Sequence, residues 1–159
     1  MILYHGTNVD FRKIDLSKSM SYKDFGRGFY LTDILSQAQR MAARKSHRFG
    51  TAIVQAYEVE DAVIKGLAGC RIKIFKEPNE EWAMFILNNR KRSIPPFEHD
   101  YDIVCGPVAD DGIAYILTRF EEGTLPLADA LRELKYAHLS SQYCFCTPLS
   151  IKYLKRIAL

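Results

Sequence analysis

Apolar and polar residues follow two periods along the chain, and each period predicts one kind of element. Short runs rich in β-branched and aromatic residues predict strands at 2–5, 29–32, 51–59, 101–104 and 142–147. Apolar residues spaced three or four positions apart predict helices in between, and also after the last strand. The pattern therefore describes a chain in which short strands and helices are mixed.

Capping residues and apolar faces predict where the helices begin and what they bury. Asp33 is expected to cap the first helix, whose inward positions are Ile34, Ala38, Met41 and Ala42. Its outward positions are Arg40, Arg44 and Lys45. Further helices are expected over 81–89, after Asp110 or Asp111, and from Pro126. A C-terminal helix would turn Ile151, Leu154 and Ile157 inward.

The order of these elements favours an α+β fold in one domain, residues 1–159. No repeat, linker or low-complexity tract interrupts the sequence. A doubly wound sheet would alternate strand and helix regularly and carry a glycine-rich phosphate turn. Gly26-Arg27-Gly28 lacks the third glycine and precedes a strand, so it is not a dinucleotide-binding fingerprint.

Composition and charge are those of an ordinary globular protein. Apolar residues make up 48% and charged residues 26%, and a net charge of +3 suits a phosphate-bearing ligand without requiring nucleic acid. The 4 cysteines show no metal-ligand spacing, so we expect reduced thiols and no metal. The sequence shows no signal segment and no apolar run of roughly 20 residues, so we expect a cytoplasmic protein with no membrane partner.

Three segments are polar or glycine-rich beside a predicted strand. They are Tyr4-His5-Gly6-Thr7, the stretch from Asp24 to Thr32, and Ser140-Ser141-Gln142. A histidine beside glycine offers an imidazole next to accessible backbone groups, and aromatic residues after glycines suit a planar ring. Taken singly, each segment is typical of a turn or a packed strand, and the two interpretations stay open at this point.

Together, the first two segments resemble the catalytic strands of ADP-ribosyltransferases of the poly(ADP-ribose)-polymerase-like and diphtheria-toxin-like classes. The similar stretches are Leu3-Tyr4-His5-Gly6-Thr7 and Phe25-Gly26-Arg27-Gly28-Phe29-Tyr30-Leu31-Thr32-Asp33. Most of the chain also resembles a bacterial family of uncharacterised domains assigned to that superfamily, through 80–82, 89–90, 102–111, Gln142 and Phe145. The resemblance implies a split β-sheet core with flanking helices.

The resemblance also implies a site for NAD, used as a substrate. By similarity His5, Tyr30 and Gln142 form the catalytic triad, in which His5 binds the adenosine ribose and Tyr30 stacks on nicotinamide. Gly6 would hold the carboxamide through its backbone. The remaining residues implied in NAD binding are Thr7, Arg27, Gly28 and Met41. Such a site orients the ribose and stabilises an oxocarbenium-like transition state.

The third triad position departs from the better-known enzymes, which have glutamate where this chain has Gln142. An amide keeps a hydrogen bond but loses a charge that is worth on the order of 4 kcal/mol at 4 Å and a dielectric of about 20, before desolvation. We therefore expect single transfer or weak activity. Glu81, Asp110 or Asp111 are alternative carboxylates, although helix capping and solvated first turns explain all of them. Met41, Phe29 or Trp82 remain alternatives for the second wall of the nicotinamide pocket.

The resemblance implies a mono-ADP-ribosyltransferase that modifies a macromolecular acceptor, a protein or a nucleic acid. A toxin-like or defence role would follow from the habits of the superfamily and would require an antitoxin partner in the producing cell. Two alternatives stay open. One is a catalytically weak or inactive module that binds NAD or ADP-ribose, and the other is an NAD glycohydrolase with water as the acceptor.

Overall fold

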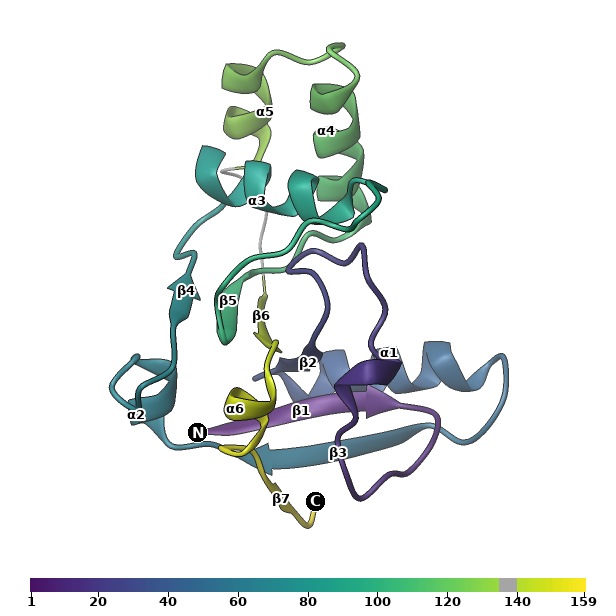
Figure 1. The fold of residues 1–159 in the computed structure, drawn as a ribbon. Coiled ribbons are helices and arrows are strands. Elements are labelled where there is room, and N and C mark those ends of the chain that lie inside the picture. The colour runs from purple at the N-terminus through teal and green to yellow at the C-terminus, as the bar shows by residue number, and fades with distance from the viewer. Residues whose placement is uncertain (135–139) are drawn as a thin grey trace.

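The structure is a computed structural model that describes residues 1–134 and 140–159, and within them it forms a mixed sheet flanked by helices (Figure 1). The described strands are β1 (Ile2–Thr7), β2 (Phe29–Thr32), β3 (Ile53–Glu58), β4 (Ile72–Ile74), β5 (Ile103–Pro107), β6 (Ser141–Phe145) and β7 (Lys155–Ile157). Their spatial order is β4-β5-β6-β2-β1-β3-β7. Among the strand pairs of the described residues, only β4 and β5 are parallel, so the expected α+β class is confirmed.

The helices divide between the two faces of the sheet. They are η1 (Leu16–Lys18), α1 (Leu35–Ser46), α2 (Asp61–Ile64), α3 (Glu80–Arg90), α4 (Asp111–Glu121), α5 (Leu127–Leu134) and α6 (Pro148–Ile151). In Figure 1, α3, α4 and α5 gather at one end, and α1 lies against β1 and β3. Gly6, on which α1 packs, shares its sheet face with the strand residues that α3, α4 and α5 cover, whereas α2 and α6 pack on the opposite face. No helix in the described part of the chain has the length and apolar character to cross a membrane.

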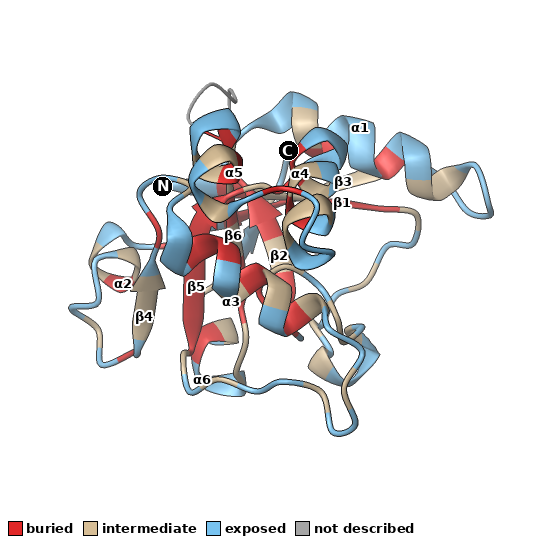
Figure 2. Cartoon of the chain, turned by 90° about the horizontal axis from the view of Figure 1, so that it is seen from above, coloured by how far each residue is buried: buried red, intermediate tan, exposed pale blue. Residues whose placement is uncertain are grey.

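Two apolar clusters fill the space on either side of the sheet. One joins α3, α4 and α5 to the sheet through Phe25, Trp82, Ile86, Ile113, Leu117, Leu134 and Cys144. The other lies under the loop that precedes β2 and under α2 and α6, and contains Leu3, Phe29, Leu31, Tyr57, Val63, Ile103 and Phe145. Figure 2 shows the buried residues concentrated in the central strands and the inner helix faces.

The predicted strands are confirmed with shifted ends, and four short elements, η1, α2, β4 and β7, were not predicted. The strand expected at 101–104 begins later and continues through Pro107, because its backbone pairs with β6 up to Ser141. Asp110 caps α4 by accepting from the backbone N–H of Ile113 at 3.1 Å, as expected. The helix after Pro126 is also confirmed.

The C-terminal helix was predicted wrongly. The helix α6 ends at Ile151, and the chain then forms β7, in which Ile157 pairs with Ala56 of β3. A capping box between Thr147 and Ser150, with a proline in the first turn, explains why a helix starts here. The edge of β3 pairs with the three residues of β7, from Lys155 to Ile157, and this pairing overrides the helical spacing.

The expected details of α1 were also partly wrong. Its N-cap is Ile34, which has no side-chain capping bond, and the Ile34 N–H is instead bound by Thr32 Oγ1 at 3.2 Å. Only Ala38 and Ala42 of the predicted inward residues are buried, whereas Ile34 and Met41 are exposed. The small residues are selected because α1 packs directly on the backbone of β1.

Candidate functional site

The strands β1 and β2 diverge beside the histidine–glycine segment. They pair only at Tyr4 and Thr32, whereas β1 pairs with β3 along its whole length. Continuing the antiparallel register by two residues would pair Gly6 with Tyr30. The two carbonyl groups at this point instead accept from side chains. We call this divergence the β1–β2 fork.

His5 binds the Tyr30 carbonyl oxygen through Nδ1 at 2.7 Å. A carbonyl only accepts, so Nδ1 carries the proton, and Nε2 of the neutral ring is left as an acceptor. Burial, followed by the nearby Lys45 ammonium, lowers the pKa of His5 from 6.5 to about 4, although the Tyr30 carbonyl opposes the shift. The ring also packs on Phe29, with centroids 4.4 Å apart. His5 is therefore neutral at physiological pH.

Lys45 binds the second carbonyl at the fork, that of Gly6. Its ammonium donates to the Gly6 oxygen at 2.7 Å, so the expectation that this side chain points outward from α1 was wrong. The close contact of α1 explains the glycine, because a Cβ at position 6 would lie 2.1 Å from the Ala38 carbonyl oxygen. Burial lowers the pKa of Lys45, and the neighbouring Lys23 lowers it further. The fork thus carries positive charge.

Tyr30 organises the loop that precedes β2. Its hydroxyl donates to the Gly26 carbonyl at 2.7 Å and accepts from the Phe25 N–H at 3.0 Å. Burial raises the pKa of Tyr30 well above its ordinary value, so the phenol stays neutral and keeps donating. The Lys23 ammonium lies 5.9 Å from the ring centroid. One residue thus ties the glycine-rich turn to the strand.

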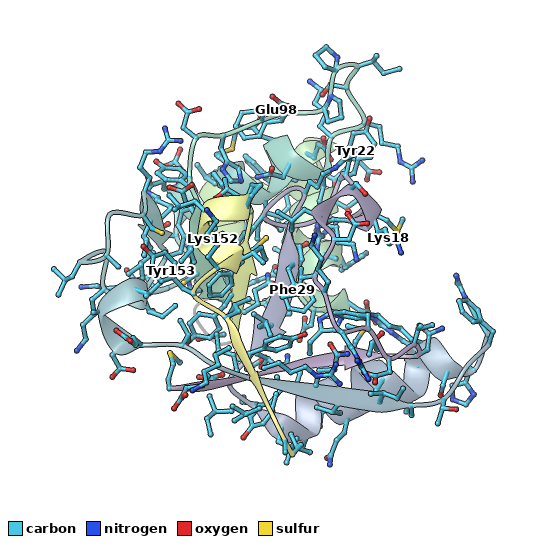
Figure 3. The ribbon with its side chains drawn as sticks, turned by 60° about the horizontal axis from the view of Figure 1, so that its bottom comes forward. Lys18, Tyr22, Phe29, Glu98, Lys152 and Tyr153 are labelled. Carbon is cyan, nitrogen blue, oxygen red and sulfur yellow. The ribbon has the colours of Figure 1, made fainter. Side chains whose placement is uncertain are left out.

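The last residue of α3 and the loop after it support the same turn. Arg90 Nη2 lies 2.6 Å from Asp24 Oδ1, His99 Nε2 lies 3.0 Å from the Phe25 carbonyl, and the Tyr22 hydroxyl donates to the Ser93 carbonyl at 3.0 Å. In Figure 3, Tyr22 and Glu98 of these two loops lie at the same end of the molecule, towards the top of the view, and Phe29 lies below them. The turn before β2 is therefore held by tertiary contacts.

Gln142 lies two strands away from His5. It pairs with Thr32 of β2 and with Gly106 of β5, and the residue is 9% exposed. Its Nε2 donates to Asp24 Oδ2 at 3.0 Å and to the Pro107 carbonyl at 3.4 Å. The carboxylate beside Gln142 is thus Asp24, a residue that sequence reasoning missed as a site residue.

The other candidate carboxylates have structural roles elsewhere. Glu81 pairs with Lys73 on the surface, Asp110 caps α4, and Asp111 is exposed in the first turn of that helix. Trp82, an alternative pocket wall, is fully buried and donates from Nε1 to the Pro107 carbonyl at 3.2 Å. None of these residues contacts Gln142 directly in the described hydrogen bonds.

The remaining predicted NAD-binding residues surround the fork unevenly. Thr7 is buried and donates to the Val9 carbonyl, Arg27 is exposed and donates to Ser21 Oγ, and Gly28 is bound on both backbone groups by Ser19 Oγ. Met41 is 37% exposed on α1, beside Gly6. Gly6 and Met41 therefore lie closer to the fork's centre than Arg27 does.

Strand alternation separates the predicted triad between the two faces of the sheet. Tyr30 and Thr32 share one face, and Gln142, paired with Thr32, lies on it as well. Tyr4 pairs with Thr32, so His5 is on the opposite face, next to Phe29. A ligand that touches all three residues must lie across the fork, where β1 and β2 are no longer joined.

The fold and site thus describe a mixed α/β protein with a polar site where two neighbouring strands diverge. The family described as "Protein of unknown function (DUF3990)" matches residues 1–156, so the chain belongs to that family. No curated protein and no solved structure matches the chain.

Proposed function

We propose that this protein is an NAD-dependent mono-ADP-ribosyltransferase whose NAD lies across the β1–β2 fork. The observation that carries the proposal is the hydrogen bond from His5 Nδ1 to the Tyr30 carbonyl. It leaves Nε2 as an acceptor for a ribose hydroxyl and holds the imidazole beside the strand that bears Tyr30. The resemblance of both motifs to ADP-ribosyltransferase strands supports the same assignment.

Cleavage of the bond between nicotinamide and ribose requires few functional groups from the protein. Nicotinamide leaves NAD as a neutral molecule, so its departure needs no general acid. The ribose must instead be oriented, and the positive charge that develops on it must be stabilised by acceptors. Tyr30 offers a ring fixed through its hydroxyl, and Gln142 offers an amide. Lys23 and Lys45 give the fork the positive charge that a pyrophosphate requires.

The test is nicotinamide release from NAD by the purified chain, with and without cell extract as a source of macromolecular acceptors. His5→Ala and Tyr30→Ala should lower release by about 100-fold or more. His47→Ala and Tyr115→Ala remove the same side chains from exposed positions and should leave it unchanged. Far-UV circular dichroism of every variant verifies that the fold is retained.

The other outcomes identify the alternatives. NAD that raises the melting temperature without being cleaved would point to a binding module. Release that does not depend on added acceptor would indicate a glycohydrolase. Labelled ADP-ribose on protein or nucleic acid from the extract supports the transferase and identifies its acceptor class. Absence of both binding and release would overturn the proposal.

A further inference from the structure

The side-chain amide of Gln142 has an orientation that its neighbours determine. One of its two polar atoms faces both Asp24 Oδ2, at 3.0 Å, and the Pro107 carbonyl oxygen, at 3.4 Å. A carboxylate and a carbonyl can only accept hydrogen bonds, so the atom that faces them must be the NH₂ group. Oε1 is therefore directed away from both, and no described residue donates to it.

We propose that Asp24 is a positioning residue, which fixes the Gln142 amide so that Oε1 is presented to a ligand hydroxyl. This inference rests on the proposed NAD site. The hydroxyl in question is that of the ribose attached to the leaving nicotinamide. An amide oxygen accepts a hydrogen bond from such a hydroxyl, as a carboxylate would, but carries no charge. Gln142 thus keeps a hydrogen-bond acceptor at the third triad position, and the loop before β2 determines how its side-chain amide is oriented.

Asp24 is itself immobilised, which a positioning role requires. Arg90 Nε and Nη2 approach the same carboxylate oxygen, Oδ1, at 2.8 and 2.6 Å, and Nη2 also donates to the Ala109 carbonyl at 3.2 Å. The Asp24 side chain is 14% exposed and the Arg90 side chain 28%. The second carboxylate oxygen, Oδ2, remains for Gln142. Such half-buried ion pairs with additional hydrogen bonds hold their geometry well.

This arrangement also explains why an amide occupies position 142. A carboxylate there would face Asp24 Oδ2 at about the 3.0 Å that now separates Nε2 from it. Two carboxylates at this distance cannot both be ionised at neutral pH, so one of them takes up a proton. Gln142→Glu alone therefore creates a proton-sharing pair and does not simply restore the acid of the better-known enzymes.

The experiment exchanges the acid and the amide between the two positions. Four proteins are compared: wild type, Asp24→Asn, Gln142→Glu, and the double variant Asp24→Asn/Gln142→Glu. In the double variant the amide introduced at position 24 can donate to the carboxylate introduced at position 142. Asp100→Asn makes the same substitution at a side chain that is 92% exposed and serves as the control.

The first readout needs no ligand. The carboxyl introduced at position 142 is titrated by carbon-13 NMR in the single and double variants. We expect a pKa at least one pH unit above the usual value of about 4.3 in Gln142→Glu, and a value at or below it in the double variant. Equal titration in the two proteins would overturn the positioning of the amide by Asp24.

The second readout is the rate of nicotinamide release as a function of pH. Asp24→Asn lets the Gln142 amide turn, so kcat should fall about tenfold or more with a small change in KM, while Asp100→Asn behaves as wild type. The double variant should recover at least the wild-type kcat. Unchanged kcat in Asp24→Asn, at an unchanged melting temperature, would overturn the proposal. If wild type neither binds nor cleaves NAD, the proposed function fails, and the titration alone decides the orientation of the amide.

Discussion

The imidazole of His5 and the carbonyl of Tyr30 are joined by a hydrogen bond of 2.7 Å between Nδ1 and oxygen, in place of the backbone pairing that ends at Tyr4. The bond satisfies a carbonyl that the divergence of β1 and β2 leaves without a strand partner. It also fixes the tautomer of the ring. A neutral, half-buried histidine is thus part of the sheet's own structure, and its titration is linked to folding.

The first prediction concerns stability below neutral pH. The native pKa of His5 is lowered to about 4, so between pH 6.5 and 4 the unfolded chain binds a proton that the native chain excludes. The contribution is fully present above pH 6.5 and is lost as the pH falls towards 4, and it amounts to at most about 3 kcal/mol. Urea unfolding of wild type and His5→Gln should therefore converge by about that amount between pH 7.5 and 4.5.

The control for this titration is His47→Gln at an exposed position of the α1 C-cap. Because this substitution removes an exposed imidazole, it should change the free energy of unfolding at pH 7.5 by no more than about 0.5 kcal/mol. Parallel curves for wild type and His5→Gln would show that His5 titrates normally in the native state and would refute the neutral-ring interpretation.

The second prediction isolates the effect of Lys45 on His5. Its ammonium is the second-largest cause of the lowered histidine pKa, after burial. Lys45→Met keeps the length of the side chain and removes the charge, so the pKa of His5 should rise from about 4 towards 6.5, measured from the Cε1 proton by NMR. Arg44→Gln removes an exposed cation from the same turn and should leave the His5 titration in place. A His5 pKa that stays near 4 in Lys45→Met would mean that burial alone lowers it.

Local sequence patterns were sufficient to predict those elements whose secondary structure depends little on distant parts of the chain. The strand that carries Tyr30 and the helix capped by Asp110 were predictable because alternation and a capping residue act over a few positions. The C-terminal segment was mispredicted because Ile151, Leu154 and Ile157 have helical spacing, whereas Ile157 is bound by Ala56 about a hundred positions earlier. A local sequence pattern cannot show that a distant strand edge will pair with the segment.

The site shows the same limit at the level of side chains. His5, Tyr30 and Gln142 were predicted as site residues because they lie in or beside recognisable motifs, and their strands β1, β2 and β6 lie side by side in the order β6-β2-β1. Asp24 was noticed only as the first residue of a glycine-rich stretch, because its contact with Gln142 joins residues 118 positions apart. The direction of a long flexible side chain is equally hard to predict from sequence. Lys45 bends inward to the Gly6 carbonyl from a helix face that is otherwise exposed.

The third prediction concerns the packing of α1 on the fork. A Cβ at Gly6 would lie 2.1 Å from the Ala38 oxygen and 2.8 Å from the Ala42 nitrogen, both backbone atoms that cannot rotate away. Gly6→Ala must displace the helix, and we expect a loss of roughly 1–3 kcal/mol in the free energy of unfolding. Gly112→Ala, inside α4 and with its nearest contact at 3.5 Å, should be neutral or stabilising by up to about 1 kcal/mol. Equal losses in urea unfolding would show that α1 does not press on Gly6.

The fourth prediction separates backbone strain from steric contact in the turn before β2. Gly26 and Gly66 have nearly the same positive φ, +75° and +76°, so alanine costs each roughly 1–2 kcal/mol for the conformation alone. A Cβ at Gly26 would also lie 2.7 Å from Asn89 Oδ1, whereas nothing lies within 4 Å of one at Gly66. Asn89 cannot easily turn aside, because its Nδ2 donates to the Phe85 carbonyl at 2.8 Å.

We therefore expect Gly26→Ala to lower the free energy of unfolding by about 1 kcal/mol or more beyond the loss in Gly66→Ala. Removing the obstacle should recover that excess, so Gly26→Ala/Asn89→Ala should be more stable than the two single losses predict. In the same double-mutant cycle built on Gly66 the two losses should add, because a Cβ at Gly66 would have no atom, of Asn89 or any other residue beyond its chain neighbours, within 4 Å. Additivity in both cycles would show that only the backbone conformation selects glycine at position 26, and that α3 does not constrain the turn that holds Tyr30.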